Sequence, residues 1–124
     1  GNQEGMKTVA EKLNQEWKGS GFRAHFIGDY YTKSQADIRK YLVGRGFAES
    51  DVGSHAGMTD TSELMAIDPS LIRMDKRAPG GGFENSGVSG DPSKATPELG
   101  RELLKIKIDN GLAQIRASLA EKSQ

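Results

Sequence analysis

The sequence predicts an α/β protein with a small, partial sheet and about four helices. Three observations lead to this prediction. Apolar residues recur at helical spacing near both ends of the chain, residues 22–28 alternate as strands do, and a second helical segment follows that alternation directly. A chain of 124 residues is one ordinary domain at most, so residues 1–124 are expected to form a single domain.

The first half of the chain supplies a helix, a strand and a second helix. A helix is expected over residues 3–17, where Met6, Val9, Leu13 and Trp17 recur at helical spacing. Residues 22–28 form the one persuasive strand. Ser34 and Asp37 have the spacing of a capping box, which predicts a helix that begins at Ser34 and ends at Gly44 or Gly46.

The second half is expected to hold two more helices and a long loop. A helix near Thr61–Ile67 should stop at Asp68-Pro69, and residues 71–74 are a weak second strand. Residues 75–96 are rich in glycine and predict a loop. Thr96-Pro97 then opens the last helix, along which an apolar stripe runs: Leu104, Ile108, Leu112, Ile115 and Leu119.

Composition narrows the class of partner. Lysine plus arginine equals aspartate plus glutamate at 17 each, so no net field attracts nucleic acid or an anionic membrane. The chain has no cysteine, which excludes disulfides and thiolate metal sites, and no apolar run of membrane-spanning length. We expect a soluble protein, cytoplasmic or periplasmic, whose incomplete sheet is completed by strands from further copies in a homo-oligomer.

His55 is the first candidate functional residue. It lies in a Gly-Ser-His-Ala-Gly loop and, as an imidazole, suits proton transfer near neutral pH. Asp60 follows five residues later, near the start of the expected third helix, where a carboxylate is favoured. The alternative is that Asp60 or Thr61 merely caps this helix and His55 is an ordinary loop side chain, and spacing alone favours that alternative.

Further candidates for substrate binding lie at the end of the predicted strand and in the glycine-rich loop. Asp29, Tyr30 and Tyr31 follow the strand, where α/β proteins place binding groups, although ordinary aromatic packing would explain the tyrosines equally well. Glu84 is a possible polar contact from the loop. The only other histidine, His25, lies within the expected strand. A side chain that is exposed to solvent or hydrogen-bonded within the protein is a simpler explanation for it than a metal ligand.

Three motifs resemble the creatininase (creatinine amidohydrolase) family. They are GSHAGMTDTSELMAIDPSLIRMDK, GVSGDPSKATPELGRELL and the opening Gly-Asn-Gln, in the order the family has them. The resemblance implies a three-layer α/β fold and metal-dependent hydrolysis of C–N bonds in small cyclic amides or formamides. It further implies divalent zinc, manganese or iron, and a ring-shaped homo-oligomer. His55 would pass a proton to the leaving nitrogen, Asp60 would hold a metal or its water, and Tyr31 would line the pocket.

The chain also departs from the family pattern. The family's first metal motif, Glu-x-His followed by Asp, is absent, and Met58 and Asp60 stand where many members have glutamate. The chain therefore resembles the C-terminal portion of such an enzyme, in a truncated form. Three alternatives remain open at this stage: a hydrolase that regains its site by assembly, a non-catalytic module that binds a small polar ligand, and a self-associating structural protein.

Overall fold

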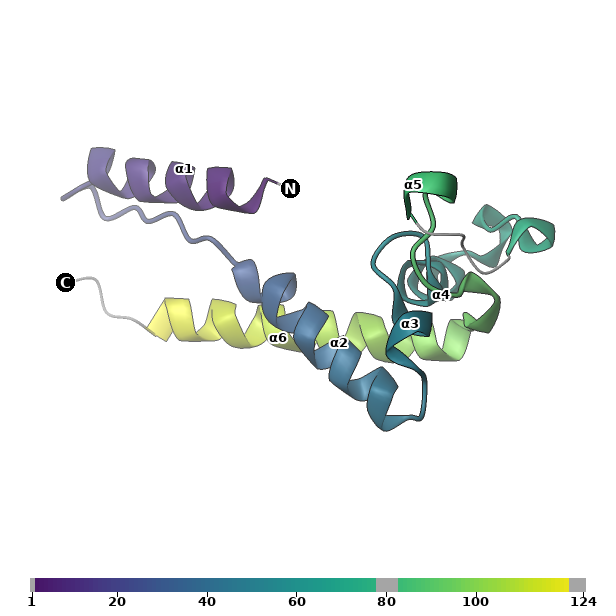
Figure 1. The fold of residues 1–124 in the computed structure, drawn as a ribbon. Helices are drawn as coiled ribbons and strands as arrows, with labels where there is room; N and C mark the ends of the chain where they lie inside the picture. Colours follow the sequence, from purple (N-terminus) through teal and green to yellow (C-terminus); the bar gives the residue numbers. More distant parts are fainter. Residues whose placement is uncertain (1, 78–82, 121–124) are drawn as a thin grey trace.

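The computed structural model describes residues 2–77 and 83–120, and only the backbone of residues 83 and 84. Its long helices are α1 (Gln3–Glu16), α2 (Thr32–Gly44), α4 (Met58–Ile67) and α6 (Pro97–Ala120), and its short ones are α3 (Glu49–Val52) and α5 (Phe83–Ser86). Four 3₁₀ turns join them: η1 (Gly28–Tyr30), η2 (Pro69–Leu71), η3 (Met74–Lys76) and η4 (Pro92–Lys94). The long helix α6 runs along the molecule, with α2 crossing it and α4 packed at its N-terminal end (Figure 1).

The predicted α/β class is wrong. Residues 2–77 and 83–120 contain no strand, and the nearest thing to a sheet is one isolated antiparallel bridge between His55 and Ser89. The partial sheet to be completed by oligomerisation is therefore absent from the described chain, as is any three-layer arrangement.

Residues 22–28 are not a strand because side-chain amides, rather than a neighbouring strand, satisfy their backbone. The amide of Asn14 accepts a hydrogen bond from the Ala24 N–H at 2.8 Å and donates one to the Ala24 carbonyl at 2.9 Å. Gln114 of α6 donates to the Phe26 carbonyl at 3.1 Å and accepts from the Asp29 N–H at 2.7 Å. An alternating sequence without a second strand to pair with stays a single extended segment.

The weak second strand over residues 71–74 is also wrong. Asp68 accepts a hydrogen bond from the Ser70 N–H at 2.9 Å, and Pro69 occupies the first position of η2. This Asp-Pro turn curls the backbone into successive 3₁₀ turns, η2 and η3, in place of an extended segment.

The four predicted helices are confirmed, but two begin earlier than expected: α2 at Thr32 and α4 at Met58 rather than near Thr61. The first and last helices lie where expected, and the Thr96 hydroxyl caps α6 by accepting the Leu99 N–H at 3.1 Å. However, α2 begins two residues before Ser34, so Ser34 is not a cap. It is fully buried and donates to the Asp29 carbonyl at 3.0 Å. The described residues of the expected loop over residues 75–96 include parts of η3, α5 and η4, and residues 78–82 of that loop lie outside the described part of the chain.

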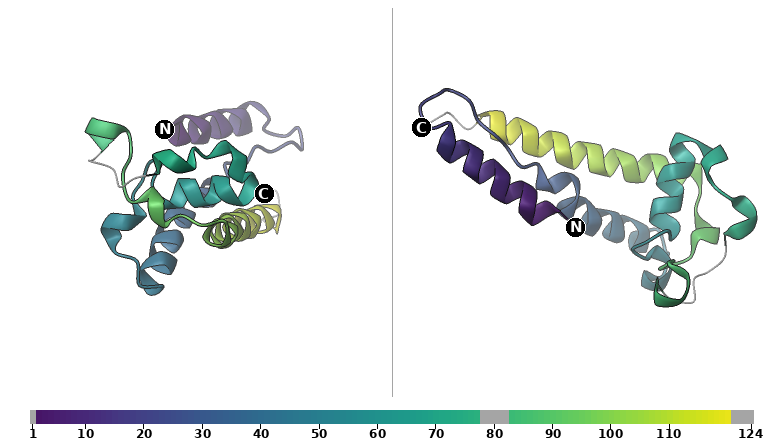
Figure 2. Two further views of the ribbon diagram at one scale, coloured as in Figure 1. Left: turned by 90° about the vertical axis from the view of Figure 1, so that its right-hand side faces the viewer. Right: turned by 90° about the horizontal axis from the view of Figure 1, so that it is seen from above.

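A small apolar core joins four of the helices. Its buried members are Ile38 and Leu42 of α2, Val52 of α3, Met58 of α4, and Leu99 and Leu103 of α6. By contrast, α1 has no buried residue and lies away from this core, and the extended segment that follows it runs between α1 and the distal half of α6 (Figures 1 and 2). No helix within the described part of the chain is long and apolar enough to cross a membrane.

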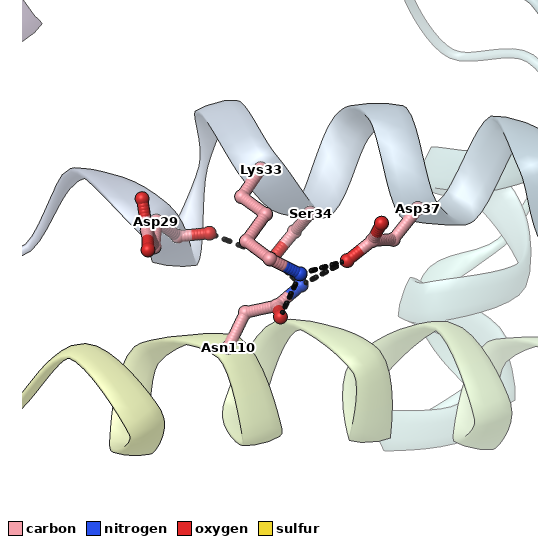
Figure 3. A network of polar contacts seen from close by, with 5 residues as sticks. All are labelled: Asp29, Lys33, Ser34, Asp37 and Asn110. Carbon is pink, nitrogen blue, oxygen red and sulfur yellow. Dashed lines mark hydrogen bonds and ion pairs between the residues drawn. The ribbon is translucent and has the colours of Figure 1, made fainter. Parts of the chain in front are cut away.

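A polar network joins α2 to α6 beyond the core (Figure 3). The side-chain amide of Asn110 donates to Asp37 at 2.9 Å and to the Ser34 hydroxyl at 3.3 Å, while Lys33 donates to the Asn110 carbonyl oxygen at 2.8 Å. Hydrogen bonds from Lys33 and Asn110 hold the pKa of Asp37 below its usual value. These partners connect the helices through hydrogen bonds where apolar side chains are lacking.

Helices α4 and α6 touch through their backbones. A β-carbon placed on Gly100 would lie 1.8 Å from the Ser62 carbonyl oxygen, and Ser62 is fully buried. The Ser62 hydroxyl also accepts the Thr96 N–H at 3.2 Å, so the same residue holds the start of α6. The close crossing of these helices thus requires glycine at position 100.

Gly100→Ala should lower the free energy of unfolding by about 1–3 kcal/mol, because the added methyl group forces the two helices apart. Urea denaturation followed by circular dichroism measures the change. Gly44→Ala is the matched control: it also replaces a helical glycine, but nothing lies within 4 Å of the new β-carbon. Equal stability of the two variants would contradict the described crossing.

Candidate functional site

A cavity of about 530 Å³ lies where α2, the residues after α3, the start of α4 and one side chain of α6 converge. Its polar lining comes from all four of these segments. Tyr31, Gln35 and Arg39 contribute from α2 and its N-terminal side, His55 from the loop after α3, Thr59 and Asp60 from α4, and Lys107 from α6. The volume suits a small molecule rather than a polymer.

The loop that carries His55 crosses the segment before α6. The His55 carbonyl accepts a hydrogen bond from the Ser89 N–H at 2.8 Å, and the Asp51 carbonyl accepts one from the Asp91 N–H at 2.9 Å. Two of the stretches that resemble the creatininase family, around residues 53–57 and 87–91, therefore meet in space. Each stretch supports the other's backbone.

Two glycines allow this crossing. A β-carbon on Gly53 would lie 1.6 Å from the Ser89 carbonyl oxygen, and one on Gly57 would lie 2.2 Å from the same atom. Gly53 also has a φ of 64°, which side-chain-bearing residues rarely adopt. The small residues around His55 are thus explained by backbone packing, whether or not they also open the way to a ligand.

Ala56, the residue after His55, has a left-handed backbone. Its φ of 48° is the one positive value at a non-glycine residue in the described chain. Two side chains of α4 hold it there: the Asp60 carboxylate accepts the Ala56 N–H at 3.0 Å, and the Thr61 hydroxyl donates to the Ala56 carbonyl at 3.2 Å. The start of α4 therefore shapes the peptide groups on both sides of Ala56.

The two cations on the cavity wall already have acidic partners. Arg39 forms an ion pair with Glu49, and both side chains are more than half exposed. Lys107 pairs with Glu63 of α4 at 2.5 Å, and this pair is largely buried at 19% and 13% exposure. This pair connects α4 to α6, and solvent and salt screen it less than they screen a surface pair. Lys107 therefore belongs to the framework of the cavity as well as to its lining.

The structure brings together three of the predicted site residues: Tyr31, His55 and Asp60 line one cavity. Asp29 and Tyr30 lie outside its lining, in η1 against α6. There the ring of Tyr30 comes within 3.3 Å of a β-carbon built on Gly111. His25 is exposed in the extended segment, and the side chain of Glu84 lies outside the described part of the structure.

The lining residues that were not predicted from the sequence include Gln35, Arg39, Thr59 and Lys107. For α2 a signal existed, since Tyr31, Gln35 and Arg39 recur every four residues and so share one helix face. For Lys107 no local signal existed, because only the crossing of α4 and α6 brings it to the cavity.

An ion pair between Asp51 and Lys94, called the clasp below, lies next to the contact between the His55 loop and the segment before α6. The Lys94 ammonium donates to the Asp51 carboxylate at 2.7 Å, and a second carboxylate, that of Asp91, lies 3.9 Å away. The hydrogen bond from Lys94 lowers the pKa of Asp51, and in return the pKa of Lys94 is raised. The pair thus favours the charged form of each partner.

This clasp should weaken in acid. Because the pKa of Asp51 is lowered on folding, its contribution to stability is complete above the unfolded value of about 4 and is lost as pH falls through the folded value. Urea unfolding between about pH 2.5 and 7 should show that the free energy of unfolding falls less on acidification for Asp51→Asn than for the wild type. Parallel pH curves for the two proteins would contradict the clasp.

The described residues do not fit the divalent metal that the resemblance implies. Across residues 2–77 and 83–120 no group of three or more His, Asp or Glu side chains is placed to hold a metal ion. His55 and Asp60 share the cavity but have no third such partner there. A protein metal site usually needs at least three ligands, so these two do not suffice.

Comparison with family models identifies one family. The model described as "Creatininase: Creatinine amidohydrolase" matches residues 1–115. Searches of curated proteins and of solved structures found no match. Because the family match covers most of the chain, the chain belongs to the creatininase family of hydrolases.

Proposed function

We propose that the chain is a hydrolase component that binds a small cyclic amide or formamide in the cavity beside His55 and cleaves its C–N bond. The observation that carries this proposal is the meeting of His55 and Tyr31 on the wall of one small-molecule cavity, in a chain of the creatininase family.

His55 is the proposed acid–base group. In amide hydrolysis a water oxygen bonds to the carbonyl carbon, the C–N bond breaks and the nitrogen must leave with a proton. An amide nitrogen is a poor leaving group unless it is protonated, and an imidazole transfers protons readily near neutral pH. His55 supplies that proton and regains one from the attacking water.

The remaining lining suits a neutral polar substrate. Gln35 and Thr59 offer hydrogen-bond donors and acceptors, and Tyr31 offers a ring wall and a hydroxyl. Because Arg39 and Lys107 are already paired with acids, the cavity does not demand a charged substrate. A compact amide meets these conditions.

His55→Ala should lower kcat for hydrolysis by about 10²- to 10⁴-fold, which is the usual contribution of a general acid or base. The assay follows hydrolysis of creatinine, other cyclic amides and formamides by the purified chain. It is run with zinc, manganese or iron(II) added in turn, and after chelation.

His25→Ala is the matched control, because it removes the other histidine, which is exposed and outside the cavity. Its activity should equal that of the wild type. Hydrolysis undiminished in His55→Ala would overturn the assignment of His55, and no hydrolysis under any condition would overturn the proposed activity of the chain alone.

A second candidate function, self-association, is favoured by the apolar surface of α6. Four residues of its predicted stripe are at least 39% exposed: Ile108, Leu112, Ile115 and Leu119. The opposite face already packs on α2 and α4 through Leu99 and Leu103, so α6 is apolar on two faces and covered on one. A helix of this kind is normally buried on both sides. We propose that a second copy of the chain covers the exposed stripe in a homo-oligomer.

Leu112→Asp should shift the protein from oligomer to monomer, because it places a charge in the middle of the stripe. Size-exclusion chromatography with light scattering measures the mass. The control Ala113→Asp adds the same charge to an exposed position on another face of α6 and should leave the mass unchanged. A monomeric wild type would contradict self-association.

A further inference from the structure

We propose that Asp60 is a positioning residue that holds Ala56 in its left-handed conformation and thereby directs His55, rather than a metal ligand. This inference rests on the proposed function only for its consequence at His55. The hydrogen bond from the Ala56 N–H to Asp60, called the brace below, is inferred from the geometry of the loop alone.

The loop is held at each peptide group around Ala56. The carbonyl of His55 accepts the Ser89 N–H at 2.8 Å, and the N–H of the next residue, Ala56, donates to the Asp60 carboxylate at 3.0 Å. On the other side, the Ala56 carbonyl accepts the Thr61 hydroxyl at 3.2 Å. Both peptide groups that flank Ala56 are therefore fixed from outside the loop.

The brace is needed because the conformation is unfavourable. A left-handed backbone brings the β-carbon of any residue except glycine too close to the following carbonyl oxygen. Ala56 has no polar side chain with which to stabilise itself there, as asparagine or aspartate could. Without the Asp60 hydrogen bond, the loop would relax toward negative φ and rotate the peptide group that carries the His55 carbonyl.

The position of Asp60 in α4 suits this role. Gly57 caps α4, so Asp60 is the third residue of the helix, where a carboxylate commonly reaches back to the backbone before the helix. Here it reaches one residue further back, to Ala56. Asp60 thus uses a carboxylate oxygen on the loop, while the described chain offers no three-residue group in which it could hold a metal.

Two substitutions of Asp60 separate a brace from a metal ligand. Asn keeps a side-chain oxygen that can accept the Ala56 N–H. It lacks the negative charge that a divalent cation favours. Ala removes both the acceptor and the charge. A brace therefore predicts that Asn substitutes for Asp and Ala does not, whereas a metal ligand predicts that both fail.

Ala56→Gly provides an independent rescue. Glycine adopts positive φ freely, so it should restore the loop in the double variant Asp60→Ala/Ala56→Gly without restoring any metal ligand. A role in holding the helix alone would not be rescued by a change at residue 56, because α4 begins after it.

The first readout is hydrogen exchange of the residue 56 amide, measured by NMR. Asp60→Ala should speed exchange about tenfold or more and shift the ring resonances of His55. Asp60→Asn should stay within about threefold of the wild type, and the double variant should recover the His55 resonances. Failure of Asn to preserve the amide's protection, or of glycine to restore the resonances, would overturn the proposal.

The second readout is kcat for amide hydrolysis in the same four proteins. Activity should follow the His55 resonances: retained in Asp60→Asn, lost in Asp60→Ala and largely recovered in the double variant. If no protein hydrolyses any amide, the proposed function fails while the exchange data still decide the brace. Loss of activity in Asp60→Asn with an intact loop would instead show that the charge of Asp60 is required.

Discussion

The close crossing of α4 and α6 is the contact on which the rest of this molecule depends. Because Gly100 has no side chain, the Ser62 carbonyl can approach α6, and Ser62 can bind the N–H of Thr96 at the same time. This fixes where α6 begins and brings Lys107, about two turns after Gly100, to Glu63. The same crossing also places the segment before α6 over the loop that carries His55. One wall of the cavity and the support of its candidate acid–base residue therefore follow from a single glycine.

The loop around His55 shows how backbone packing and chemistry can use the same residues. Gly53 and Gly57 flank His55 because the Ser89 carbonyl oxygen lies where their side chains would be. A histidine between small residues suggests easy access for a ligand, but here the fold alone requires those residues to be small. The functional argument for His55 consequently rests on its place in the cavity, beside Tyr31, and not on the composition of its loop.

The sequence predicted the helices well and the sheet wrongly, for a physical reason. A helix satisfies its own backbone, so spacing within one segment is enough to predict α1 and α6. A strand needs a partner, and residues 22–28 found the side-chain amides of Asn14 and Gln114 instead. The site residues could be predicted or not for the same reason, namely whether they depend on local or on distant contacts. Residues close in sequence, such as His55 and Asp60, were predicted together, whereas Lys107 reaches the cavity only through the crossing of two helices.

The two halves of α6 serve different purposes. Its first half packs into the apolar core through Leu99 and Leu103, whereas beyond Ile106 the face toward α2 and η1 consists of small and polar residues, including Asn110 and Gly111. Apolar side chains in that second half lie on the opposite face and are exposed. Since the cavity draws only Lys107 from α6, a partner that covers the exposed face would touch few of the residues that shape the cavity. Assembly and small-molecule binding are therefore separable in this chain, and a change that disrupts one need not disrupt the other.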